Sequence, residues 1–292
     1  MHIRYKKAIC VLFFPFFIRS FPSHREMEVT SSAFRKISAQ SLHVSKPTHW
    51  LTSRFHFSFA DYYNPYNLNF GVLRVLNDDL VLPKNGFGMH PHRDQEIFSY
   101  IVNGELSHED NQGNQETLGR GAVQFMSAGR GVWHSEMNNH PKDTVRFLQI
   151  WISPNQKGLP VKYGSHHFNF EQRHNQLLPI IKGEGSSSAD SPAPITLSQD
   201  CNVYVSEMDR NVCVTKEIFS GRQAYMVLIE GGVQVEGDMH TGSSGNQSSS
   251  GCSSSNTTLS MRDALEVMGP VNLRVTSTSD SSHFLLIEMA SP

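Results

Sequence analysis

The sequence predicts an all-β protein, a sandwich or barrel, and the prediction rests first on two observations. From His49 onward, short apolar or aromatic runs alternate with Gly, Asn, Asp and Pro roughly every ten residues, the pattern of strands and turns. Long stretches with the 3.6-residue period of a helix do not occur in this region of the sequence. The clearest runs are residues 54–59, 71–76, 97–102 and 145–152.

The second half of the sequence repeats the first. Three segments recur in the same order, and the Ser-rich run at 240–258 explains a change in their spacing as an inserted surface loop. Chance similarity between apolar strands is the alternative, but the shared order favours a duplicated barrel. We therefore expect an N-terminal barrel over residues 46–185 and a C-terminal barrel over residues 186–292. The recurring segments are 120–126 with 262–268, 100–106 with 227–233, and 147–150 with 284–287.

Residues 1–45 differ in composition from the rest of the chain. Basic residues precede an apolar run from Ala8 to Ile18, and residues 31–45 are rich in Ser and basic side chains. A basic start followed by a short apolar run resembles a targeting signal, and the run is too short to cross a bilayer comfortably. We expect residues 1–45 to be a leader for an organelle or for secretion. The alternative is a disordered tail or a misassigned start, with the protein in the cytoplasm or nucleus.

Charge and cysteine content exclude several classes of function. The net charge is -2 and the sequence has no long Lys/Arg cluster, so we expect no direct binding to nucleic acid. The four cysteines include no closely spaced pair, which favours reduced thiols over a disulfide framework. With 292 residues, each half can bury a core of its own. We expect a monomer without a stable membrane span.

Two pairs of potential metal ligands carry most of the functional information. His90 and His92 form one pair, and His134 and Glu136 form the other. Residues two apart on a strand face the same side, so two neighbouring strands could aim all four side chains at one point inside a barrel. Either pair alone is weak evidence, since surface histidine pairs are common. Together they predict a metal site with nitrogen and oxygen ligands and an open coordination position, which suits Fe(II), Mn, Ni, Co or Cu.

The remaining histidines are interpreted as structural. His166 and His167 are adjacent, so they point to opposite faces of a strand, and surface or inter-barrel packing is the expected role. The run from His108 to Asp110 follows a glycine turn and is interpreted as a solvated loop, with a place near the mouth of the pocket as the alternative. In the second half, the positions that match His90 and His92 fall near Glu217 and Phe219, so only the first barrel keeps the predicted site.

Three pieces of the sequence resemble the pirin family of the cupin superfamily. They are FHFSFADYY at 55–63, HPHR at 90–93 and LGRGAVQFMSAGRGVWHSE at 118–136. The similarity extends from His49 to the C-terminus and its motifs are long and specific. It implies a bicupin, two tandem cupin (jelly-roll) β-barrels, whose N-terminal barrel binds a single metal ion, usually iron.

The family's four ligands correspond to His90, His92, His134 and Glu136, and all four match. The sequence departs from the family directly after the first motif, where pirins commonly have Gly-Phe and this chain has Asp94-Gln95. Because this change lies beside the ligand strand, it bears on substrate and on the shape of the site more than on metal binding.

The resemblance implies two kinds of function. In the first, the protein is a quercetin 2,3-dioxygenase-like oxidoreductase that acts on a flavonol-like aromatic substrate and O₂. Glu136 is then both a ligand and the base that takes the hydroxyl proton of the flavonol. In the second, it is a non-enzymatic, iron-bound regulator, a transcription cofactor that binds a protein partner. We expect the first, with one divalent ion, Fe(II) before Mn, Ni, Co or Cu.

Overall fold

The computed structural model describes residues 33–185, 193–238 and 254–292, which lie in one compact unit. These residues form two seven-stranded and two four-stranded sheets, so the all-β prediction is confirmed. Helical structure in the described residues is limited to η1 (Ala39–Ser41) and α1 (Phe170–Arg173). A search of the same residues finds no helix with the length and apolar character to cross a membrane.

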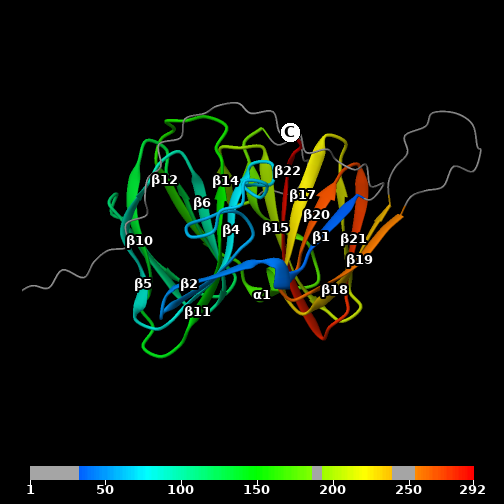
Figure 1. The fold of residues 1–292 in the computed structure, drawn as a ribbon, viewed down its shortest axis with the longest axis horizontal. Coiled ribbons are helices and arrows are strands. Elements are labelled where there is room, and N and C mark those ends of the chain that lie inside the picture. The colour runs from blue at the N-terminus through cyan, green and yellow to red at the C-terminus, as the bar shows by residue number, and fades with distance from the viewer. Residues whose placement is uncertain (1–32, 186–192, 239–253) are drawn as a thin grey trace, which may run out of the picture. The chain divides into compact units, whose positions relative to one another are not determined.

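The strands of the first half build one barrel from a seven-stranded and a four-stranded sheet (Figure 1). The larger sheet has the order β12-β9-β6-β11-β4-β3-β2, and the smaller has the order β5-β10-β7-β8. Alternating burial along strands such as β7 and β10 points one row of side chains into this barrel. The bounds are β2 (His43–Thr48), β3 (Leu51–Phe55), β4 (Leu73–Val81), β5 (Asn85–His92), β6 (Glu96–Asn103), β7 (Leu106–Asp110), β8 (Gln115–Leu118), β9 (Ala122–Ser127), β10 (Val132–Asn138), β11 (Val145–Ile152) and β12 (Lys162–His167).

The second half builds the same architecture. Its sheets have the orders β1-β20-β17-β22-β15-β13-β14 and β16-β21-β18-β19. The recurring sequence segments fall on equivalent strands, β9 with β20, β6 with β17 and β11 with β22, so the predicted duplication is confirmed. The bounds are β1 (Phe34–Ile37), β13 (Leu178–Gly183), β14 (Ile195–Leu197), β15 (Cys201–Asp209), β16 (Cys213–Ile218), β17 (Arg222–Glu230), β18 (Gly232–Asp238), β19 (Ser254–Ser260), β20 (Ala264–Met268), β21 (Val271–Ser277) and β22 (Ser281–Ala290).

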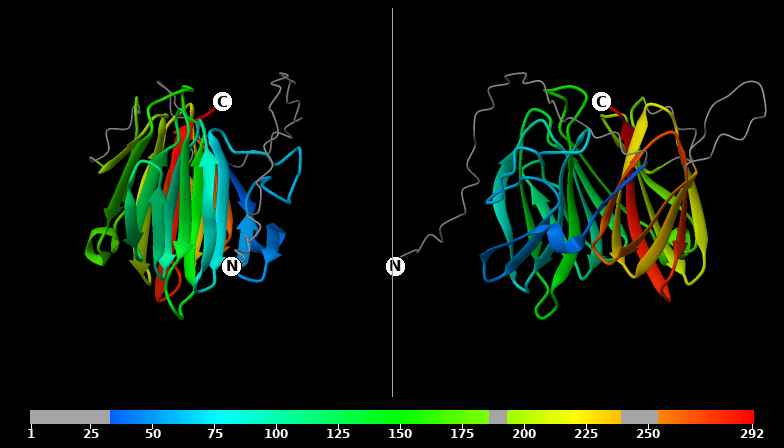
Figure 2. Two further views of the ribbon diagram at one scale, coloured as in Figure 1. Left: turned by 90° about the vertical axis from the view of Figure 1, so that its left-hand side faces the viewer. Right: turned by 45° about the vertical axis from the view of Figure 1, so that its right-hand side comes forward.

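The structure corrects the boundaries expected from the sequence. Strand β1 and the first half of β2 fall within residues 1–45, yet β1 pairs with β20 of the second barrel and β2 pairs with β3 of the first. An ion pair between Arg35 and Glu266 links β1 to its partner (Figure 2, where β1 is blue and lies against the orange strands). Strand β13 precedes the expected boundary at 185 but pairs with β14 and β15 of the second barrel. Residues 1–32 of the leader expected at 1–45 lie outside the described residues.

The Ser-rich run lies only partly within the described residues. Residues 254–258, expected to be loop, begin β19, which pairs along its length with β18. Residues 240–253 lie outside the described part of the chain.

The larger sheets of the two barrels share an apolar core. The largest buried cluster takes Leu148 and Ile150 from β11 together with Leu285 and Ile287 from β22. Burial of such side chains contributes about 1.5–3 kcal/mol each relative to leaving them exposed. The two barrels are therefore joined by an interface with the character of a protein interior.

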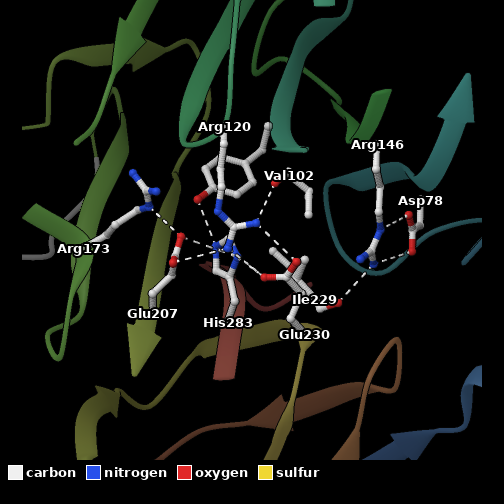
Figure 3. Close-up of polar contacts among 10 residues, drawn as sticks. Asp78, Val102, Arg120, Arg146, Arg173, Glu207, Ile229, Glu230 and His283 are labelled. Atoms are coloured by element: carbon white, nitrogen blue, oxygen red, sulfur yellow. Dashed lines mark hydrogen bonds and ion pairs between the residues drawn. The ribbon is translucent and has the colours of Figure 1, made fainter. Parts of the chain in front are cut away.

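Polar groups are also buried between the barrels, and several of them form a network around Glu207 (Figure 3). Arg173 lies 2.7 Å from Glu207, and Arg120 lies 2.7 Å from Glu230 and 3.3 Å from Glu207. The imidazole Nε2 of His283 is 2.9 Å from the hydroxyl of Tyr100 on β6. Buried charges of opposite sign are paired here, as the low-dielectric interior requires.

Candidate metal centre

Three of the predicted ligands meet inside the first barrel. Strands β5 and β10 are antiparallel neighbours, with His90 opposite His134 and His92 opposite Val132. One ring nitrogen from each of the three histidines lies within 4.8 Å of the others. The separations of the ring centroids are 4.5 Å for His90–His134, 4.7 Å for His90–His92 and 4.9 Å for His92–His134.

A local backbone feature allows the two strands to approach. A Cβ on Gly86 would lie 2.4 Å from the backbone oxygen of Glu136, so only glycine fits at this point of β5. The pairing then changes register between His134 and Glu136, because two residues of β10 span three of β5. This bulge re-aims the strand that carries His90 and His92.

The ring nitrogens are arranged to leave lone pairs for a cation. The Nδ1 of His90 is 2.7 Å from the carbonyl oxygen of Gly88, which can only accept, so Nδ1 carries the hydrogen and Nε2 is the free base. The Nε2 of His134 is buried and has no hydrogen-bond partner among the described residues. Burial, followed by the neighbouring histidines, holds the pKa of His134 well below its usual value, and burial and His90 lower the pKa of His92 to about 3.

These observations fit a divalent metal ion. Three imidazoles, one of them buried and two half-buried, suit iron, nickel and copper, and an unpartnered buried nitrogen is otherwise costly. A purely structural role for the three rings would leave that nitrogen without any compensating contact.

Glu136 is on the same face of β10 as His134 but is placed differently. Its carboxylate accepts from the Ser99 hydroxyl at 2.7 Å and from the Gln149 amide at 2.5 Å, and the side chain is buried. Among the described residues, the cluster of potential ligand atoms contains the three imidazoles and not this carboxylate. Ser99 on β6 and Gln149 on β11 therefore orient Glu136, and neither was predicted from the sequence.

The interior around Glu136 is polar. Asp79 on β4 is buried against the hydroxyl of Ser53, and burial raises its pKa to about 7. Asn77, two residues earlier on the same strand, has a buried amide oxygen without a partner in the described residues. Apart from those that join the core shared with the second barrel, the buried apolar residues of this barrel form two separate clusters rather than one.

Trp151 borders the imidazoles. Its ring lies edge-on to His92 with the centroids 4.8 Å apart, and it also packs edge-on with Phe59 at 5.4 Å. The indole Nε1 is buried and, in the part of the chain that the structure describes, has no acceptor. It is a candidate hydrogen-bond donor to a ligand beside the imidazoles.

The second barrel has no counterpart of the histidine cluster among the residues described. In the second barrel, Lys216 and Ile218 occupy the positions of His90 and His92, one residue before the positions expected from the sequence. Leu273 and Val275 occupy the positions of His134 and Glu136. Leu273, Val275 and Ile218 are buried in a single continuous apolar core.

Two residues interpreted as a solvated loop are part of the site. His108 and Asp110 lie on β7, 2% and 5% exposed, with His108 opposite Glu136 and Asp110 opposite His134. The signal that could have identified them is the period-two pattern Leu106-x-His108-x-Asp110, which places all three on the inner face. Three adjacent strands thus each contribute an i, i+2 polar pair.

The first of the two residues that depart from the family pattern, Asp94, has a structural role. Asp94 has a positive φ of 52°, and its carboxylate accepts from the backbone N–H of Gly158 at 2.7 Å. It therefore fixes the loop after β11. His166 is half-buried against Phe168 and His167 is exposed, and neither belongs to the histidine cluster.

Comparison with known families accounts for both barrels. Residues 36–152 match the family model described as Pirin, and residues 186–289 match the model described as the quercetinase C-terminal cupin domain.

Several named relatives span most of the chain. A Pseudomonas aeruginosa protein provisionally named a quercetin 2,3-dioxygenase is 35% identical over 82% of this chain and 93% of its own length. The quercetin 2,3-dioxygenase of Escherichia coli K12 is 34% identical over 64% of this chain and 78% of its own length. A pirin-like protein of Caulobacter vibrioides is 39% identical over 64% and 79% of the two chains.

Solved structures share the fold. The crystal structure of YhhW from Escherichia coli superposes with a TM-score of 0.75 at 27% identity, covering 89% of this chain and 98% of that one. Its nickel(II) complex, described as a bacterial pirin, has a TM-score of 0.74 at 27% identity and covers 89% and 100%.

Proposed function

The chain belongs to the pirin family, and from this premise we propose that it is a metal-dependent dioxygenase of the quercetinase type, acting on a flavonol-like substrate and O₂. The observation that carries the proposal is the cluster of His90, His92 and His134, with a buried, unpartnered Nε2 on His134. The names of the relatives supply the substrate class.

His90, His92 and His134 would hold the ion through neutral nitrogens, and Glu136 is proposed as the fourth ligand. We propose Fe(II) as the ion, with Mn, Ni, Co and Cu as alternatives that the same ligands accept. When bound, a redox-active divalent ion supplies the Lewis acidity and electron transfer that a reaction between a flavonol and O₂ requires.

Glu136 is proposed as the base. An acidic hydroxyl of the substrate gives its proton to a carboxylate oxygen of Glu136, and the electron pair remains on the substrate oxygen. The donors Ser99 and Gln149 keep the carboxylate in one orientation, so the proton acceptor is held in place before the substrate arrives. The indole N–H of Trp151 is available to a substrate oxygen, and Phe59 stiffens that ring.

The test separates metal binding from catalysis. Metal-free protein is loaded anaerobically with Fe(II), Ni(II), Mn(II), Co(II) or Cu(II) in turn, and bound metal and O₂ uptake with quercetin are measured. We expect uptake with at least one ion, loss of metal and uptake in His134→Ala, and loss of uptake with metal retained in Glu136→Gln. Glu109→Gln, an exposed carboxylate on β7, is the matched control and should behave as wild type.

Two results would contradict the proposal. If every loaded form binds metal but consumes no O₂ with quercetin, the enzyme assignment is wrong while the metal centre stands. If no ion is retained, the metal centre itself is wrong.

A further inference from the structure

A second polar pair supports the histidine cluster from the neighbouring strand. His108 and Asp110 face the barrel interior from β7, where they pair with Glu136 and His134 of the neighbouring strand β10. The Nδ1 of His108 lies 3.4 Å from the Nδ1 of His134, and its Nε2 lies 3.5 Å from an oxygen of Asp110. Both ring nitrogens of His108 are therefore directed at partners, one of which is a candidate ligand.

Asp110 is held as an acceptor by the turn that follows it. One carboxylate oxygen accepts from the backbone N–H groups of Gln112 at 2.9 Å and Asn114 at 3.0 Å. The other accepts from the side-chain amide of Asn114 at 2.8 Å and faces His108. A carboxylate surrounded by donors only accepts, so the hydrogen on His108 is expected at Nε2.

The position of the hydrogen on His108 determines which nitrogen of His134 carries a hydrogen. With its hydrogen at Nε2, the His108 ring offers Nδ1 as an acceptor. His134 then carries its hydrogen at Nδ1 and donates it to His108, which leaves the lone pair of His134 at Nε2. This is the same nitrogen that is buried and unpartnered, on a ring that belongs to the cluster with His90 and His92.

The ring of His108 is also fixed in orientation. Tyr163 on β12 stacks on it with the centroids 4.7 Å apart and an angle of 21°, and the Tyr163 hydroxyl donates to Glu116 at 3.1 Å. The two distances of the relay, 3.4 and 3.5 Å, exceed the usual range of about 2.7–3.2 Å, so each contact is weak. The relay therefore acts by selecting a tautomer and an orientation, which needs rigid partners more than short bonds.

We propose that Asp110 and His108 form a positioning relay that holds His134 in the tautomer able to bind a metal through Nε2. The proposal rests on the metal centre described above and extends it to a strand that supplies no ligand. Outer-shell partners of metal-binding histidines typically change metal affinity by about 10–100-fold when they are replaced. His90 differs, because its supporting acceptor is the carbonyl of Gly88, two residues away on its own strand.

Two variants interrupt the relay in different ways. Asp110→Asn keeps an oxygen for the backbone donors but can turn an amide N–H toward His108, which would reverse the direction of donation. His108→Phe keeps a ring for Tyr163 to stack on and removes both nitrogens. His166→Phe is the matched control, since His166 is a half-buried histidine on β12 outside the cluster.

The first measurement is Ni(II) binding to metal-free protein by calorimetry, with the apo melting temperature recorded for each variant. We expect both relay variants to bind Ni(II) about 10–100-fold more weakly, and His166→Phe to bind as wild type. Wild-type affinity in folded Asp110→Asn and His108→Phe would overturn the relay and leave the metal centre intact. Failure of the wild type to bind Ni(II), Fe(II) or any other ion tested would instead overturn the proposed centre.

The second measurement reads the tautomer without any metal. Nitrogen-15 spectra of the imidazoles in the metal-free wild type should place the hydrogen of His134 at Nδ1 and that of His108 at Nε2. In Asp110→Asn the His134 hydrogen should move to Nε2. A wild-type His134 with its hydrogen at Nε2 would contradict the proposal even if both variants failed to fold.

Discussion

Replacing Glu207 with Gln should destabilise the protein strongly, because this carboxylate joins the two barrels. Glu207 lies on β15 of the second barrel, and its side chain is 5% exposed. It faces three cationic or potentially cationic groups, Arg173 at 2.7 Å, Arg120 at 3.3 Å and His283 at 3.7 Å (Figure 3). The change removes one negative charge and leaves the shape of the side chain nearly the same.

The magnitude follows from what Arg173 loses. The Arg173 side chain is 4% exposed, and its other hydrogen-bond partner among the described residues is the backbone carbonyl of Phe168. An uncompensated buried charge costs about 3–5 kcal/mol, so Glu207→Gln should lower the free energy of unfolding by that amount. Replacing both partners, with Arg173→Met added, should cost less than the sum of the single changes, because no charge is then stranded.

Urea unfolding of metal-free protein at neutral pH provides the measurement. Glu236→Gln is the control, since Glu236 forms an exposed pair with Arg274 at 3.7 Å and should change stability by less than about 1 kcal/mol. Although burial acts in the opposite direction, His283 and the two arginines hold the pKa of Glu207 below its usual value. Its stabilising contribution is therefore present above the unfolded pKa and is lost as pH falls through the folded one. A cost below about 1 kcal/mol, or full additivity in the double variant, would refute this reasoning.

Three further predictions concern the site and the domain boundary. Ser99→Ala removes a donor to Glu136 and should lower the rate of flavonol-dependent O₂ uptake by about tenfold or more with bound metal unchanged, as oxygen-electrode and metal assays can establish. Burial raises the pKa of Asp79 from 3.8 to about 7, so the folded protein holds a proton that the unfolded chain releases. The free energy of unfolding should therefore fall by up to about 4 kcal/mol as the pH rises from 4 to 7. Urea titrations of Asp79→Asn should no longer show this dependence on pH. A chain that begins at Ser38 lacks β1 and should be about 2–4 kcal/mol less stable than one that begins at Ala33, whereas equal stability would show that β1 contributes nothing.

The strands and the duplication could be predicted because their signals are local. Alternating apolar residues in β6 and β11, and the recurrence of RGAVQFM as RDALEVM, are visible without any knowledge of the fold. Strand β1 could not be predicted this way, because it has four residues, two of them basic, and its partner β20 is more than two hundred residues away. Composition alone assigned it to the leader.

The candidate ligands were predicted for the same local reason, since i, i+2 spacing on a strand fixes which side chains share a face. The residues that support them were missed. His108 and Asp110 lie in a charged stretch that resembles a loop, and their burial depends on the pairing of β7 with β10. Ser99 and Gln149 are ordinary residues in apolar strands, and only the closure of the barrel brings them to Glu136.

The first barrel holds the polar candidate site, and the second barrel has a continuous apolar core at the equivalent positions. Buried polar groups weaken an apolar core, and the first barrel accepts that cost around Glu136 while the second fills the equivalent positions with Leu273 and Val275. Strand β6 connects the two barrels, because its side chains alternate between faces. Ser99 points inward to Glu136, and Tyr100 points outward to His283 of the second barrel. The second barrel therefore needs no metal of its own to matter for the proposed reaction, since it anchors the strand that orients the proposed base.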